Sequence, residues 1–112
     1  METQIETVGK VAVMVVEGDS LDASNSRDFK RSAMEVVQNH SKVVFDLSGL
    51  EFVDSSGLGV ILSCLRHLNS SGGDLKLCGM TKPVRALFEL VRMHRIFEIF
   101  STREDAIRAF VN

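Results

Sequence analysis

The chain has 112 residues, of which 45% are hydrophobic and 25% are charged, and its formal net charge at pH 7 is -2. This length gives one domain with one real core, and no basic patch with interleaved aromatic residues points to nucleic acid. The longest apolar run, 11–16, is too short to span a membrane, and the first residues lack the pattern of a signal peptide, so we expect a cytoplasmic protein.

The two cysteines, Cys64 and Cys78, are too few for a disulfide framework and too far apart for a C-x-x-C motif. We expect both to be free thiols. Cys64 lies off the main apolar face of its predicted helix, so it is expected to be partly exposed. The sequence shows no metal-binding pattern and no nucleotide-binding fingerprint, so neither a metal nor a cofactor is expected.

Short apolar runs predict strands along the chain. The expected strands are 4–8 and 10–17, which form a hairpin around Gly9, followed by 42–47, 74–78 and 96–100. The unit from 42 to 78 reads as strand, helix, strand, which implies a parallel pair joined by a right-handed crossover. The pattern is that of a single α/β domain over residues 1–112, with a partly parallel sheet and several helices.

Apolar positions spaced by three and four residues predict helices in four places. The first is capped by Ser24 or Asn25, the second starts near Ser56, the third carries Pro83 in its first turn, and the last follows a capping box that begins at Ser101. The expected core faces are Phe29, Ala33, Val36 and Val37; Leu58, Ile61, Leu62, Leu65 and Leu68; Val84, Leu87, Phe88 and Val91; and Ala106, Ile107 and Phe110.

The most informative segment is Asp54-Ser55-Ser56-Gly57-Leu58-Gly59, because it places two hydroxyls at the start of a helix directly after a buried strand. The first turn of a helix has backbone N–H groups without intrahelical partners and the positive end of the dipole. A serine there can cap the helix, and a phosphate on that serine is favourably placed.

Three roles for these serines remain open from the local pattern: an N-cap cluster, a phosphoacceptor at Ser55 or Ser56, and a catalytic nucleophile. The third role is disfavoured because the nearest downstream histidine, His67, is twelve residues from Ser55. That separation is roughly 18 Å along a helix, so His67 cannot act as the base.

Together with Gly72-Gly73-x-Leu75-x-Leu77 and Pro83-Val84-x-x-Leu87-Phe88, the serine segment resembles the STAS domain of bacterial anti-sigma factor antagonists. The resemblance covers nearly the whole chain. It implies a mixed, mostly parallel sheet with an N-terminal hairpin strand and about four helices. It also implies that the first hydroxyl after the aspartate, at Ser55, is phosphorylated by a partner anti-sigma factor that is a serine kinase, with Ser56 as the second choice.

The resemblance implies further site residues. Asp22 would flank Ser55, but the loop 18–22 is one residue longer than the commonest form in the family, so Asp19 and Asp22 also keep a role in the turn and the helix cap. The other expected flanking residues are Asp54, Ser56, Gly57 and Leu58. Val60, Cys64 and His67 are expected on the exposed face of the same helix.

The function implied is a binding switch and not an enzyme. The unphosphorylated protein would bind the anti-sigma factor and release its sigma factor, phosphorylation of Ser55 would switch binding off, and a serine phosphatase would restore it. The alternative is a STAS interaction module of another system, such as a stressosome, a lipid-transport accessory protein or a transporter, that phosphorylation does not regulate. A small nucleotide-binding or hydrolytic enzyme is a third possibility, disfavoured because no P-loop or catalytic base is present.

Overall fold

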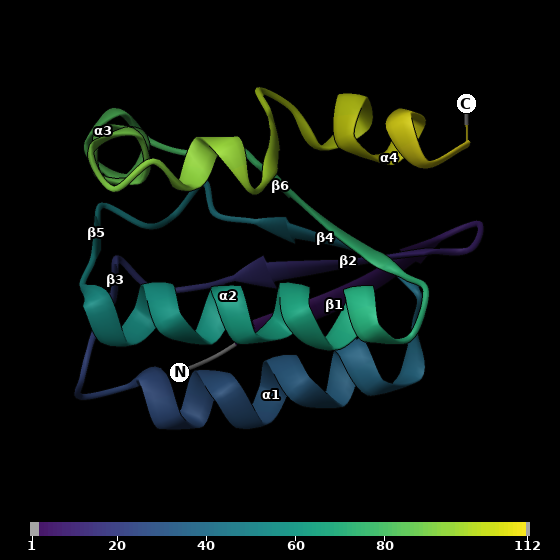
Figure 1. The fold of residues 1–112 in the computed structure, drawn as a ribbon, viewed down its shortest axis with the longest axis horizontal. Coiled ribbons are helices and arrows are strands. Elements are labelled where there is room, and N and C mark those ends of the chain that lie inside the picture. Colours follow the sequence, from purple (N-terminus) through teal and green to yellow (C-terminus); the bar gives the residue numbers. More distant parts are fainter. Residues whose placement is uncertain (1–2, 112) are drawn as a thin grey trace.

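The computed structural model describes residues 3–111 and contains one five-stranded sheet with the order β1-β2-β4-β6-β7 (Figure 1). The strands are β1 (Thr3–Val8), β2 (Val11–Val16), β4 (Lys42–Asp46), β6 (Asp74–Cys78) and β7 (Glu98–Phe100). The pair β1 and β2 is antiparallel, and the other neighbouring pairs are parallel. The expected mixed, mostly parallel sheet with an N-terminal hairpin is thus confirmed.

The hairpin turns through Gly9 and Lys10, which lie between the paired residues Val8 and Val11. Gly9 has a φ of 61° in the first central position of this two-residue turn. A type II′ turn favours glycine there, because other residues rarely adopt a positive φ.

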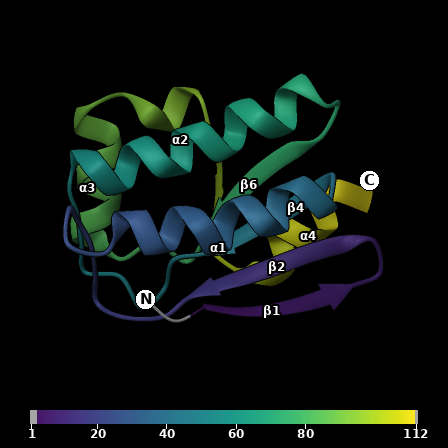
Figure 2. The same cartoon turned by 90° about the horizontal axis from the view of Figure 1, so that it is seen from below.

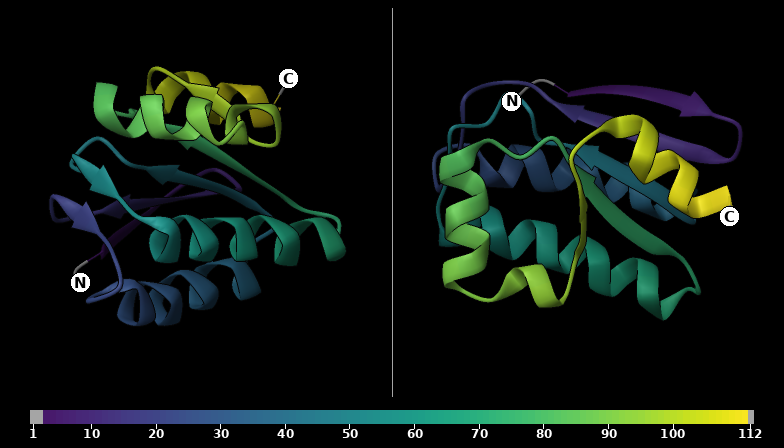
Figure 3. Two further views of the ribbon diagram at one scale, coloured as in Figure 1. Left: turned by 60° about the vertical axis from the view of Figure 1, so that its left-hand side comes forward. Right: turned by 90° about the horizontal axis from the view of Figure 1, so that it is seen from above.

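In the part of the chain that the structure describes, four helices cover the sheet: α1 (Ser26–Asn39), α2 (Ser55–Ser70), α3 (Lys82–Leu90) and α4 (Arg103–Val111). Helices α1 and α2 lie side by side on one face and α4 lies on the other, while α3 and the short 3-10 helix η1 (Met93–Arg95) close one end (Figures 2 and 3). This number agrees with the sequence-based expectation. Within residues 3–111, no helix combines the length and the apolar character that crossing a membrane requires.

A second, two-stranded sheet, which the sequence pattern did not predict, joins β3 (Ser20–Leu21) to β5 (Phe52–Val53). The strands are parallel, with Ser20 opposite Phe52 and Leu21 opposite Val53. Because β3 precedes α1 and β5 precedes α2, this small sheet brings the starts of the two helices together.

The core consists of two clusters on opposite faces of the sheet. The larger one, under α1, α2 and α3, includes two edge-to-face aromatic pairs, Phe29 with Phe45 at 5.9 Å and Phe88 with Phe97 at 6.0 Å between ring centroids. The smaller cluster lies under α4 and includes Ala106. Most of the predicted core faces are buried or half-buried, including all four residues expected for α1.

The buried surface of α2 is wider than the sequence predicts. Val60 and Cys64, expected on the exposed face, are buried, and only His67 of that group is half-exposed. The prediction was wrong because α2 packs against both α1 and the sheet, so it buries two neighbouring stripes. Burial raises the pKa of the Cys64 thiol to about 12, so this thiol stays protonated at neutral pH.

The end of α3 also differs from the prediction. Val91, expected in the core, is 41% exposed because the helix ends at Leu90 and Arg92 then takes a left-handed conformation with a φ of 63°. Ile96, expected in the last strand, follows η1 and is exposed, so that strand is reduced to β7.

The caps of α1 and α4 differ in detail from the prediction. Asn25 is in the N-cap position of α1, but its side chain bonds to the N–H of Asp22 and the carbonyl of Ser20 instead of capping the helix. At α4, the hydroxyl of Thr102, and not that of Ser101, accepts the N–H of Asp105 at 3.1 Å. Helix α1 thus begins at a predicted cap position but has no side-chain cap, and the cap of α4 lies one residue later than predicted.

An ion pair between half-buried Arg103 and buried Asp46 fixes α4 to the sheet. Arg103 donates to Asp46 of β4 at 2.8 Å and to Glu6 of β1 at 3.1 Å. Burial alone would raise the pKa of Asp46, but the hydrogen bonds from Arg103 and Ser48 outweigh it, and the pKa lies below its usual value. The carboxylate form of Asp46 therefore stabilises the folded protein above the ordinary carboxyl pKa, and this stabilisation is lost as pH falls through the lowered value.

We expect Arg103→Met to lower the free energy of unfolding at pH 7 by about 1–2 kcal/mol, because it leaves Asp46 buried without its cation. The variant should also lose less stability than the wild type between pH 7 and about pH 3. Urea unfolding at both pH values measures this. Arg108→Met is the control, since Arg108 is exposed and its pair with Asp105 is worth little. Equal effects of both substitutions would contradict the role given to Asp46.

Candidate functional site

The first turn of α2 presents two serine hydroxyls to solvent. Ser55 and Ser56 are the first two residues of the helix, both are exposed, and neither hydroxyl has a hydrogen-bond partner among residues 3–111. The N-cap is Asp54, whose Oδ1 accepts the N–H of Gly57 at 3.0 Å. Within the N-cap cluster of Asp54, Ser55 and Ser56, the cap is therefore Asp54 and neither serine hydroxyl.

The second carboxylate oxygen of Asp54 bonds across to another loop. Its Oδ2 accepts the N–H of Ala23 at 3.0 Å, and its own backbone N–H donates to the carbonyl of Leu21 at 3.0 Å. We call these contacts, together with the bond to Gly57, the Asp54 clamp. The clamp fixes the start of α2 against the loop between β3 and α1, so that the serines stand on a rigid support.

Gly57 allows this close approach of helix and loop. A Cβ atom built on Gly57 would lie 2.6 Å from the Cγ of Leu21 and 2.7 Å from its carbonyl oxygen. Gly57 is accordingly buried, whereas Leu58 is half-buried and packs against the main core. Both residues therefore have a packing role at the entry of the helix.

Asp22 lies in the loop that the clamp holds, between Leu21 and Ala23. Its carboxylate accepts hydrogen bonds from the N–H and hydroxyl of Ser24 and from the hydroxyl of Ser20. These bonds keep the pKa of Asp22 below its usual value, and the bond from the Ser24 hydroxyl has the largest effect. The same residue thus forms the turn before α1 and stands near the start of α2.

Asp19 lies three residues before Asp22 in the sequence. It is exposed, and its carbonyl accepts the N–H groups of Glu51 at 2.7 Å and Phe52 at 3.2 Å. Its backbone thus helps to align the segment that leads into β5. The structure shows this backbone role for Asp19 and the turn role for Asp22.

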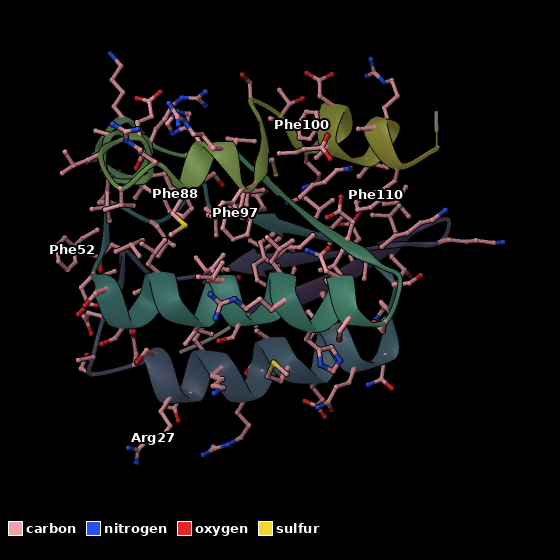
Figure 4. All side chains as sticks on the ribbon, in the orientation of Figure 1. Arg27, Phe52, Phe88, Phe97, Phe100 and Phe110 are labelled. Atoms are coloured by element: carbon pink, nitrogen blue, oxygen red, sulfur yellow. The ribbon has the colours of Figure 1, made fainter. Side chains whose placement is uncertain are left out.

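Phe52 is a surface residue beside the site that the sequence pattern did not single out. It is 55% exposed on β5, two residues before Asp54, and Figure 4 shows its ring at the same end of the molecule as the start of α2. A large apolar side chain left in water is informative only through its surroundings, and here it lies three residues before the exposed Ser55 hydroxyl, at the same end of the molecule. No sequence pattern identifies it, because β5 has only two residues.

The chemistry available at this end of α2 is anion binding and modification. The backbone N–H groups of Ser55 and Ser56 have no acceptor in the part of the chain that the structure describes, and the helix dipole adds partial positive charge there. In the same residues, no group of three His, Cys, Asp or Glu side chains has a metal-binding arrangement. The arrangement can hold a phosphate on either serine.

We expect Asp54→Ala to lower the free energy of unfolding by about 1–2 kcal/mol, because it removes the N-cap and the bond to Ala23 together. Asp54→Asn separates the two contributions. Asparagine caps helices about as well as aspartate, but its NH2 group replaces one of the two oxygens that accept from Gly57 and Ala23, so one of these N–H groups loses its acceptor and about half of that loss is expected. Thermal or urea unfolding measures both, and an asparagine variant as stable as the wild type would show that the bond to Ala23 contributes nothing.

Comparisons with known proteins agree with this geometry. A family model of the STAS domain matches residues 2–106, so the chain belongs to the STAS domain family. The anti-sigma F factor antagonist of Paenibacillus polymyxa is 31% identical over 110 residues, which are 96% of this chain and 94% of that protein. The resemblance seen in the sequence is thus confirmed.

Solved structures give the same fold. The crystal structure of an anti-sigma factor antagonist from Mycobacterium paratuberculosis has a TM-score of 0.89 at 24% identity and covers 99% of this chain and 94% of that one. The phosphorylated form of the Bacillus cell fate determinant SpoIIAA has a TM-score of 0.74 at 22% identity, with 97% of this chain and 99% of that one covered. The five-stranded sheet with its helices is therefore the STAS fold.

Proposed function

We propose that this protein is an anti-sigma factor antagonist whose binding is switched off by phosphorylation of Ser55. The observation that carries the proposal is the exposed Ser55 hydroxyl at the first position of α2, free because Asp54 already caps the helix. Relatives named as anti-sigma factor antagonists, with nearly full coverage of both chains, support the assignment of the partner class. The protein acts by binding and needs no catalytic group of its own.

The partner is an anti-sigma factor with serine kinase activity. It docks on this protein at the end of the molecule around Ser55. Phe52 supplies exposed apolar area there, and Gly59, exposed on the next turn of α2, leaves room for a close approach because it has no side chain. An exposed aromatic residue at the centre of such a contact is typical of binding hot spots. The unphosphorylated protein binds through this surface and releases the sigma factor.

Phosphorylation acts through charge at a fixed position. A phosphate on Ser55 adds about 1.5–2 negative charges at pH 7, next to the carboxylate of Asp54 and near that of Asp22. The helix start stabilises the phosphate, so the fold is retained, while the charge and its hydration oppose docking of the partner. Bacillus SpoIIAA, whose fold this chain shares, has been solved in both phosphorylated and unphosphorylated forms. A serine phosphatase resets the switch.

The test is intact-mass spectrometry with peptide mapping after incubation with ATP and each anti-sigma factor kinase of the same organism. We expect one added phosphate, located on Ser55, with one of these kinases. Ser55→Ala should abolish the modification and Ser56→Ala should retain it, which separates the two serines. No modification by any kinase would favour a STAS interaction module that phosphorylation does not regulate. Modification of Ser56 would contradict the assignment of Ser55 and make Ser56 the regulated residue.

A further inference from the structure

The outer edge of β1 is an open strand edge. Within residues 3–111, β1 pairs with β2 on one side and with no strand on the other (Figure 2). Five of its six residues are exposed and the first is half-exposed. The opposite edge of the sheet, at β7, is only three residues long, so β1 is the longer of the two edges.

The β1 edge lacks the features that usually prevent strand pairing between molecules. Natural edge strands are interrupted by lysine, proline or bulges. The segment Thr3–Val8 contains neither lysine nor proline, and its one charged residue, Glu6, is paired with Arg103 at 3.1 Å. Ile5 is 53% exposed and Val8 is 40% exposed on this strand. The edge is therefore open to an additional strand.

The hairpin register determines which backbone groups point outward. Val8 and Val11 flank the two-residue turn, and residues in that position exchange hydrogen bonds with each other. Alternate residues of β1 therefore bond to β2, and those between them, Thr3, Ile5 and Thr7, direct their N–H and C=O groups away from the sheet. These three residues can form a ladder with a further antiparallel strand.

We propose that two copies of this chain pair through β1 about a two-fold axis at Ile5. In this register Ile5 lies opposite Ile5 of the second copy, and Thr3 lies opposite Thr7, so all the outward groups of residues 3–7 are paired. The register one step along would place Glu6 opposite Glu6, which repulsion disfavours. Because the strand is complementary to itself in this register, the partner at the β1 edge is a second copy of the chain and the pairing is centred on Ile5.

Each face of the joined sheet is then complementary. Ile5 lies opposite Met14, which belongs to the core cluster under α1 and α2, so the paired isoleucines cover apolar surface on that side. A groove of about 300 Å³ beside Ile5, bordered by Val36 of α1 and by His40 directly after it, gives the second isoleucine space. On the other face Gln4 lies opposite Glu6 of the second copy, where the amide can donate to the carboxylate.

The helices leave room for this pairing. On that face α1 packs over β2, and only its side chains at the groove reach Ile5 of β1. Two copies of α1 would stand three strand spacings apart, about 14 Å, which exceeds the 8–10 Å of packed helices. Because the strands run antiparallel across the axis, the two Ser55 sites point to opposite ends of the dimer. Pairing therefore leaves both sites accessible, and the dimer is independent of the proposed phosphorylation switch.

Sedimentation equilibrium of the purified unphosphorylated protein tests the proposal. We expect a monomer–dimer equilibrium with a dissociation constant of about 1–100 µM, and Ile5→Lys should weaken it at least tenfold (on the order of 1.4 kcal/mol). Ile96→Lys is the matched control, since Ile96 is 52% exposed but lies next to β7, and its dimer should be unchanged. A wild-type protein that stays monomeric to about 1 mM, or equal effects of both substitutions, would overturn the proposal.

The register has its own test. Gln4→Lys should tighten the dimer several-fold by placing a cation opposite Glu6 of the second copy, and Gln4→Glu should weaken it by a similar factor. Circular dichroism and thermal unfolding of each variant show that the hairpin is intact. Tightening by the glutamate variant, or no change with either, would exclude the pairing centred on Ile5. Failure of Ser55 phosphorylation leaves this result unaffected, because the two surfaces are separate.

Discussion

Replacing Ser55 by aspartate is expected to weaken binding of the anti-sigma factor at least tenfold, whereas Ser55→Ala should bind as tightly as the unphosphorylated wild type. Aspartate places one negative charge where the phosphate places about 1.5–2, so it reproduces the repulsion in part. Alanine removes the acceptor hydroxyl without adding charge. Calorimetric titration of the purified kinase partner with each variant gives the two affinities directly.

Unfolding of the aspartate variant cannot explain a loss of binding. A carboxylate in the first turn of a helix stabilises it by about 0.3–1 kcal/mol, so Ser55→Asp should be at least as stable as the wild type. Ser56→Asp is the positional control, because it adds the same charge one residue further around the helix. Equal affinities of Ser55→Ala and Ser55→Asp would contradict the charge switch, and equal weakening by both aspartate variants would show that position is unimportant.

The sequence predicted the main sheet and the four helices because these elements are long enough to repeat their pattern. The apolar run at 42–47 and the three-and-four spacing after Leu58 each include several buried positions. The strands β3 and β5 have two residues each, so no periodicity can reveal them. They shape the candidate site nevertheless, because their pairing aligns the two loops at the serines.

The candidate site was predictable in position but not in its contacts. The run from Asp54 to Leu58 indicated a helix start with two hydroxyls, and the structure has one there. The second bond of Asp54, to Ala23, joins residues 31 positions apart in the sequence, so local spacing cannot predict it. Likewise, a single helical face does not show that α2 packs on two sides, which is why Cys64 was misplaced.

Gly57→Ala is expected to lower the free energy of unfolding by about 3 kcal/mol, near the upper end for overpacking by one methyl group. The added Cβ would lie 2.6 Å from a side-chain carbon of Leu21 and 2.7 Å from its carbonyl oxygen. The side chain can rotate, but the carbonyl is fixed, since it accepts the N–H of Asp54 at 3.0 Å. Relief of the clash must therefore move the start of α2 away from β3.

Gly59→Ala provides a matched control in the same helix. Its added Cβ would meet nothing within 4 Å, so it should instead raise the free energy of unfolding by about 0.5–1 kcal/mol through helix propensity. Urea unfolding of the two variants therefore gives effects of opposite sign from the same chemical change two residues apart. If Gly57→Ala were as stable as Gly59→Ala, the start of α2 and the loop at Leu21 would not approach closely. The Asp54 clamp would then not hold Ser55 in a fixed position.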